Sequence, residues 1–86
     1  MKMVIVIIKD HLRDALTRAL TDGQYRVTGI ASTGGFMRSG VATLLIGVEE
    51  AQVDDAIDLI RKTVGPGSGE KQGTVFVVPV SRFEQV

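Results

Sequence analysis

The chain opens on the segment KMVIVIIK (Lys2–Lys9), in which an unbroken apolar run lies between two lysines. The run is rich in β-branched side chains and has no helical periodicity, which predicts a strand that is apolar on both faces. Two later segments have the same character, VATLLIGV (Val41–Val48) and TVFVVPV (Thr74–Val80). Three strands of this kind predict a sheet that needs cover on both sides.

Two helices are predicted between these strands. In the first, Asp10 is expected to be the N-cap and Gly23 to end the helix by accepting a positive φ. The second helix opens at Glu49 and Glu50. The apolar stripes comprise Leu12, Ala15, Leu16, Ala19 and Leu20 in the first helix and Val53, Ala56, Ile57, Ile60 and Val64 in the second. Each stripe can pack against one face of a sheet.

A further strand, Gln24–Ser32, alternates between apolar and polar residues. Arg26, Thr28 and Ser32 fall on one of its faces, and Ile30 breaks the alternation. This pattern predicts a half-buried or edge strand. Only a glycine-rich segment separates it from the next apolar strand, so the two are expected to be neighbours in the sheet.

The order βαββαβ predicts a ferredoxin-like α+β fold, with both helices on one face of a four-stranded antiparallel sheet. The other sheet face is apolar too, and exposing it to water would be unfavourable. We therefore expect copies of the chain to pack their sheets together in a trimer, with a lightly buried dimer as the alternative. At 86 residues, one domain spanning 1–86 is expected.

Composition excludes several classes of protein. Ten basic and 10 acidic side chains give a formal net charge of zero, so no global field would collect a nucleic-acid polymer. The chain has no cysteine, which excludes disulfides and thiolate metal sites and suits a reducing compartment. Its apolar runs are far shorter than the ~20 residues that cross a bilayer. We therefore expect a cytoplasmic protein with no membrane partner.

Residues that would support catalysis are few. His11 is the only histidine, and at the start of a helix it is expected to be a solvated surface residue. Asp54, Asp55 and Asp58 follow the polar stripe of the second helix, where solubility explains them better than a metal site. A hydrolase of acylphosphatase type would share the topology but needs an asparagine, and the chain contains none. No enzymatic activity is predicted.

The segment TGGFMRSG (Thr33–Gly40) combines the elements of a nucleotide site. Its paired glycines let backbone N–H groups approach an anion, and Phe36 can offer an aromatic face to a base. Arg26 and Arg38 flank the segment and suit phosphate oxygens, while Thr28 adds a hydroxyl. The alternative is a tight connector in which Phe36 fills a subunit interface.

Three stretches in order, MKMVIVIIKD, RVTGIASTGGFMRSG and TVFVVPVSRF, resemble the cyclic di-AMP receptor family of PII-like signalling proteins. The resemblance spans nearly the whole chain. It implies a homotrimer that binds the nucleotide second messenger cyclic di-AMP in clefts between subunits, without a further cofactor. Carried over by position, the ligand contacts fall on Arg26, Thr28, Gly35, Phe36, Met37, Gly47 and Phe76.

The same resemblance implies roles for these residues. Phe36 would stack on an adenine, and Arg26 and Thr28 would orient a base or a phosphate. The backbone at Gly35 would donate to the ligand, and Met37 would form an apolar wall. Phe76 keeps an alternative, because an inward phenylalanine on a central strand is most often part of the core.

Two features depart from the family pattern. Val41 stands where an asparagine is common, and GPGSGEKQG (Gly65–Gly73) is far shorter than the usual loop before the last strand. If the long loop normally signals to a protein target, this chain signals through Thr33–Gly40 or has lost that output. The remaining alternative is a structural or regulatory oligomerisation domain that binds a different small ligand or none.

Overall fold

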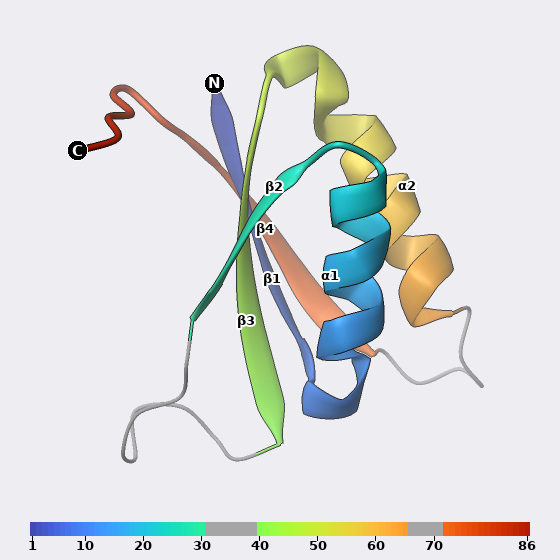
Figure 1. The fold of residues 1–86 in the computed structure, drawn as a ribbon. Coiled ribbons are helices and arrows are strands. Elements are labelled where there is room, and N and C mark those ends of the chain that lie inside the picture. The colour runs from blue at the N-terminus through green and yellow to red at the C-terminus, as the bar shows by residue number, and fades with distance from the viewer. Residues whose placement is uncertain (31–39, 66–71) are drawn as a thin grey trace.

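The computed structural model describes residues 1–30, 40–65 and 72–86. Its elements are β1 (Lys2–Lys9), α1 (Arg13–Asp22), β2 (Arg26–Ile30), β3 (Val41–Val48), α2 (Val53–Val64) and β4 (Gly73–Pro79), with the 3-10 turns η1 (Asp10–Leu12) and η2 (Glu50–Gln52) before the helices. The strands form one antiparallel sheet in the order β2-β3-β1-β4, and both helices cover the same face of it (Figure 1). The predicted ferredoxin-like α+β fold is confirmed.

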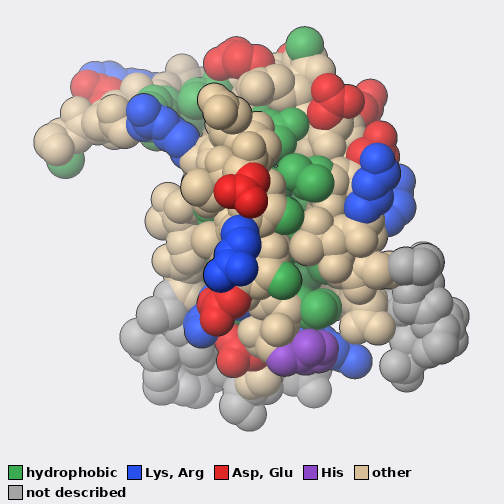
Figure 2. All heavy atoms as spheres, turned by 45° about the vertical axis from the view of Figure 1, so that its right-hand side comes forward, with side chains coloured by type: hydrophobic (Ala, Val, Ile, Leu, Met, Phe, Trp, Pro, Cys, Tyr) green, Lys and Arg blue, Asp and Glu red, His purple; other side chains and the backbone are tan. Residues whose placement is uncertain are grey.

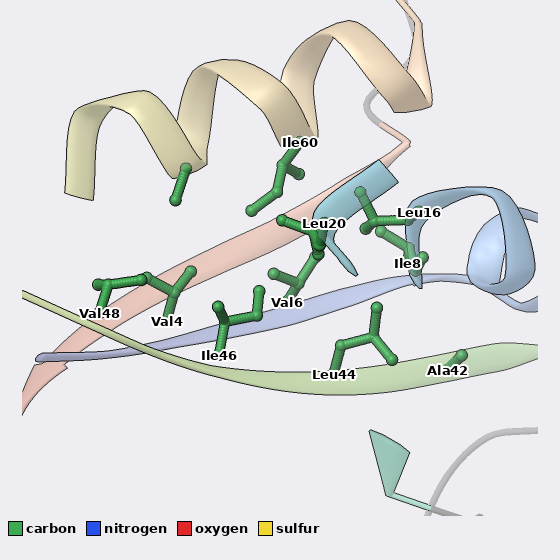
Figure 3. Close-up of a cluster of buried hydrophobic side chains, with 11 residues drawn as sticks. Val4, Val6, Ile8, Leu16, Leu20, Ala42, Leu44, Ile46, Val48 and Ile60 are labelled. Atoms are coloured by element: carbon green, nitrogen blue, oxygen red, sulfur yellow. The ribbon is translucent and has the colours of Figure 1, made fainter. Parts of the chain in front are cut away.

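The hydrophobic core lies between the sheet and the two helices (Figure 3). Side chains of β1 and β3 point toward Leu16 and Leu20 of α1 and toward Ile60 of α2. The buried apolar set is Val4, Val6, Ile8, Leu16, Leu20, Ala42, Leu44, Ile46, Val48, Ala56 and Ile60. Because successive side chains of a strand alternate, the residues between these strand positions lie on the other side of the sheet.

Neither helix in the described residues covers that second side, which we call the open face. β1 and β3 contribute the cross-strand pairs Met3 and Gly47, Ile5 and Leu45, Ile7 and Thr43, and Lys9 and Val41. β4 adds Thr74, Phe76 and Val78, and β2 adds Arg26, Thr28 and Ile30. Its central apolar side chains are only half-buried, whereas those facing the helices are fully buried. Both faces of β1 are therefore apolar, as predicted, while cover by other copies stays a prediction.

The first helix begins differently from the prediction. Asp10 is not an N-cap but the first residue of η1, and no side-chain cap hydrogen bond is present there. Its carboxylate lies 3.5 Å from the guanidinium of Arg13. Its backbone N–H donates to the carbonyl oxygen of Gly40 at 2.7 Å. This bond fastens the end of β1 to the chain that enters β3.

Gly23 follows α1 as predicted, but the predicted reason was wrong. Its φ is −79°, and the residue in the left-handed region is Gln24, with φ of 72°. A Cβ at Gly23 would lie 3.2 Å from Leu59 Cδ2 and 3.3 Å from the Tyr25 ring. A side chain at this position would require Leu59 of α2 or the Tyr25 ring before β2 to shift by a few tenths of an ångström.

The other element boundaries agree closely with the predictions except at β2, which begins at Arg26, two residues later than predicted, and whose predicted end at Ser32 lies outside the described residues. The second helical segment starts at Glu49 with a capping box, in which the Glu49 N–H donates to Gln52 Oε1 at 2.8 Å. β4 begins and ends one residue earlier than predicted. Neither helix in the described ranges is long and apolar enough to span a membrane.

Candidate functional site

The open face holds the described part of the predicted ligand site. Arg26, Thr28, Gly47 and Phe76 all lie on it, contributed by β2, β3 and β4. The predicted contacts Gly35, Phe36 and Met37, together with the flanking Ser32 and Arg38, lie outside the described residues. The structure thus places four predicted site residues on one surface.

Residues that are paired from strand to strand form rows across the sheet, and these four residues lie in two neighbouring rows. In one row Arg26 lies opposite Gly47, with Met3 next across the sheet. In the adjacent row Thr28 lies opposite Leu45 on β3, and Phe76 lies opposite Ile5 on β1. Three strand spacings separate β2 from β4, which corresponds to about 14 Å. Arg26 and Thr28 therefore occupy one edge of the open face, and Phe76 occupies the other.

Phe76 is not a core residue. β4 is an edge strand, and the side chain of Phe76 lies on the open face with 51% of its surface exposed. The alternative in which Phe76 is an inward core residue on a central strand is therefore wrong, whereas its role as a ligand contact stays a prediction. An aromatic ring this exposed is available to pack against a base or another chain.

Gly47 leaves a gap in the open face next to Arg26. Among the residues that the structure describes, a Cβ at this position would meet only Met1 Cε within 4 Å, at 3.6 Å, so packing against these residues does not demand glycine here. Its exposed backbone can be approached closely by a ligand. The sequence prediction missed Met1 as a neighbour of this position, because the contact depends on how the first residue continues β1.

The charged side chains described on the open face are all basic. This face carries Lys9 and Arg26 and, among the described residues, no aspartate or glutamate. Neither cation has a carboxylate partner in the described part of the chain. The helical side differs, because acidic and basic side chains lie side by side over it (Figure 2). The open face thus suits an anion although the chain has no net charge.

Nothing comparable supports catalysis or metal binding in the described ranges. His11 is exposed, and so are Asp54, Asp55 and Asp58 of α2. No three His, Asp or Glu side chains of residues 1–30, 40–65 and 72–86 come together in a way that could hold a metal ion. The arrangement can hold a ligand by charge, hydrogen bonding and stacking.

Comparison with known proteins adds two findings. A family model described as "Cyclic-di-AMP receptor" matches residues 1–69, a range that includes Arg26, Thr28 and Gly47 but not Phe76. A solved structure, described as a functionally unknown protein from Pediococcus pentosaceus ATCC 25745, is 32% identical with a TM-score of 0.78. The similarity covers 99% of this chain and 96% of that one.

Proposed function

Because the chain belongs to the cyclic-di-AMP receptor family, we propose that it is a signal-transduction protein that binds cyclic di-AMP on its open face and is not an enzyme. The observation that carries this proposal is the pairing of Arg26 with Gly47 on a face without a described carboxylate. A guanidinium beside exposed backbone suits phosphate oxygens, and apolar neighbours suit a purine.

The ligand lies in clefts between the subunits of a homotrimer. Half-buried residues such as Ile5 and Leu45 make the open face an unfavourable surface in water, which supports burial against other copies. β2 and β4 run antiparallel and are both unpaired on their outer sides. In a closed ring, the β2 edge of one copy meets the β4 edge of the next.

Such a ring divides each site between two copies. In one copy Leu45 and Ile5 lie between Thr28 and Phe76, about 14 Å across the sheet. Across an interface between the β2 and β4 edges, Arg26 and Thr28 of one copy approach Phe76 of its neighbour. The guanidinium then holds a phosphate, the hydroxyl orients the nucleotide and the phenylalanine faces a base.

The residues outside the described ranges keep the roles that the family resemblance implies. Phe36 stacks on an adenine, the backbone at Gly35 donates to the ligand and Met37 forms an apolar wall. Residues 1–86 act as one domain, in the cytoplasm where a nucleotide second messenger acts, and pass the signal to a protein target. Phe36→Ala should then weaken nucleotide binding and leave the trimer intact. Loss of assembly with unchanged nucleotide binding would favour a structural oligomerisation domain.

The experiment that tests this function is thermal unfolding of the purified protein with cyclic di-AMP, cyclic di-GMP, ATP or AMP. A site filled at 100 times its dissociation constant stabilises the folded state by ~2.7 kcal/mol, which raises the melting temperature of a small domain by about 10 to 20 °C. Cyclic di-AMP should give the largest shift. No shift with any of the four nucleotides would contradict the proposed receptor function.

A further inference from the structure

β1 begins and ends with a lysine, and the two lysines lie on opposite faces of the sheet. Lys2 is on the helical side, where its Nζ lies 3.9 Å from Glu50 Oε1. Lys9 continues the series of Met3, Ile5 and Ile7 on the open face and lies opposite Val41 of β3. It therefore places an ammonium group on the same surface as the candidate ligand contacts.

Lys9 has no acidic partner among the described residues. The nearest carboxylate in sequence, that of Asp10, lies 3.5 Å from the guanidinium of Arg13. Val41 opposite is apolar and offers no hydrogen bond. An exposed cation in apolar surroundings, without a carboxylate to neutralise it, is free to hold an anion from outside the chain.

The position of Lys9 links it to the Thr33–Gly40 segment. The residue after it, Asp10, donates its backbone N–H to the Gly40 carbonyl oxygen at 2.7 Å. Gly40 itself has φ of 84°, a conformation that favours glycine. The backbone directly after Lys9 is thus joined to the residue that precedes β3.

We propose that Lys9 is an additional anion-binding residue of this site and that it holds a phosphate of the bound nucleotide. This inference rests on the proposed function. Lys9 lies six residue steps along β1 from Met3, the residue in the row of Arg26, which corresponds to about 20 Å. Lys9 and Arg26 of one copy are too far apart to share a phosphate.

The two cations therefore serve different phosphates or act from different copies. Lys9 lies on β1, the neighbour of β4, in the half of the sheet that carries Phe76. Lys9 and Phe76 of one copy therefore form one side of a cleft between two copies, and Arg26 and Thr28 of the neighbouring copy form the other side. A ligand with two phosphodiesters can use both cations.

The test compares Lys9→Gln with Lys62→Gln by isothermal titration with cyclic di-AMP over a range of salt concentrations. Lys62 is a suitable control because it is exposed on α2, far from the open face, and also lacks a carboxylate partner among the described residues. Lys9→Gln should bind roughly tenfold more weakly, with a smaller effect of salt, because a charge-assisted contact is lost. Lys62→Gln should bind as the wild type does, and Lys9→Arg should retain most of the affinity.

The outcomes separate this inference from the proposed function. If the wild type binds cyclic di-AMP and Lys9→Gln has the same affinity and the same salt dependence, Lys9 is not a ligand contact, while the receptor function stands. If the wild type binds no cyclic di-AMP, both proposals fail. An equal loss of affinity in Lys62→Gln would indicate a general charge effect and would also overturn the role of Lys9.

Discussion

Arg26 and Gly47 lie directly opposite each other on the antiparallel strands β2 and β3. Side chains at such paired positions have Cβ atoms about 5 Å apart, so any side chain at residue 47 would stand beside the stem of Arg26. With glycine there, the β3 backbone opposite Arg26 is not covered by a side chain of its own. A phosphate held by Arg26 can therefore approach the β3 backbone closely.

The first prediction is that Gly47→Ala weakens cyclic di-AMP binding without weakening the fold. The new methyl group would meet Met1 Cε at 3.6 Å, an ordinary contact, and alanine is favoured over glycine in a strand. Its bulk would nevertheless keep the ligand away from the β3 backbone. We expect about a fivefold to tenfold higher dissociation constant by isothermal titration, equivalent to roughly 1 kcal/mol.

Gly29→Ala provides the matched control. Its Cβ would meet Leu44 Cδ2 at 3.7 Å, a similar contact, but on the helical side of β2. Gly29→Ala should therefore leave the dissociation constant unchanged. Equal affinity of both variants and the wild type would show that Gly47 does not border the ligand.

The second prediction concerns Phe76→Ala. Because Phe76 is half-exposed on the open face, its removal should change the unfolding free energy of the free chain little. Loss of stacking on a base should raise the dissociation constant for cyclic di-AMP by about tenfold or more, since such stacking contributes ~1 to 3 kcal/mol. Phe83→Ala is the control, because Phe83 is equally exposed, at 57%, in the segment after β4. A larger effect of Phe83→Ala would place the aromatic contact in that segment.

Much of the fold could be predicted because it follows from local patterns of apolar and polar residues in the sequence. The runs that form β1 and β3 begin and end where charge and glycine interrupt the apolar residues, and their predicted bounds match the structure. The alternation in β2 placed Arg26 and Thr28 on one face correctly. The same alternation in β1 already placed Lys9 with Met3 on the open face, so that signal was available and was missed.

Features that depend on distant parts of the chain could not be predicted. Phe76 was interpreted as a residue of a central strand, and only the strand order shows that β4 is at an edge. The reason for Gly23 lies in its packing against Leu59, a residue far away in sequence. Local propensity carries no information about such contacts.

The third prediction follows from another such contact, at Gly73. A Cβ there would lie 2.6 Å from the carbonyl oxygen of Ile7 and 2.7 Å from Ile8 Cγ2, so β1 and β4 would have to separate. Since backbone cannot move aside easily, Gly73→Ala should lower the unfolding free energy by about 1 to 3 kcal/mol in urea titration. Gly29→Ala should lower it much less. Equal stability of the two variants would show that the start of β4 can shift without penalty.

The last prediction tests whether each site is divided between copies. Arg26→Ala and Phe76→Ala should each weaken binding by about tenfold or more when either protein is assembled alone. Suppose that Arg26 comes from one copy and Phe76 from its neighbour. In oligomers reassembled from an equal mixture, a site is then intact where a Phe76→Ala copy contributes Arg26 and the neighbouring Arg26→Ala copy contributes Phe76. Random assembly restores about one quarter of the sites in a closed ring.

Titration of the mixed protein should therefore give a binding stoichiometry of about a quarter of the wild-type value at nearly wild-type affinity. A site formed by Arg26 and Phe76 of the same copy gives a different result. Every copy in the mixture would then lack one of the two residues, and no tight site would return. Refolding the two variants together from denaturant lets their subunits mix at random, because the oligomers then form from unfolded single chains. Recovered sites would mean that the edges of β2 and β4 meet in the assembled receptor, since neither edge alone carries both residues.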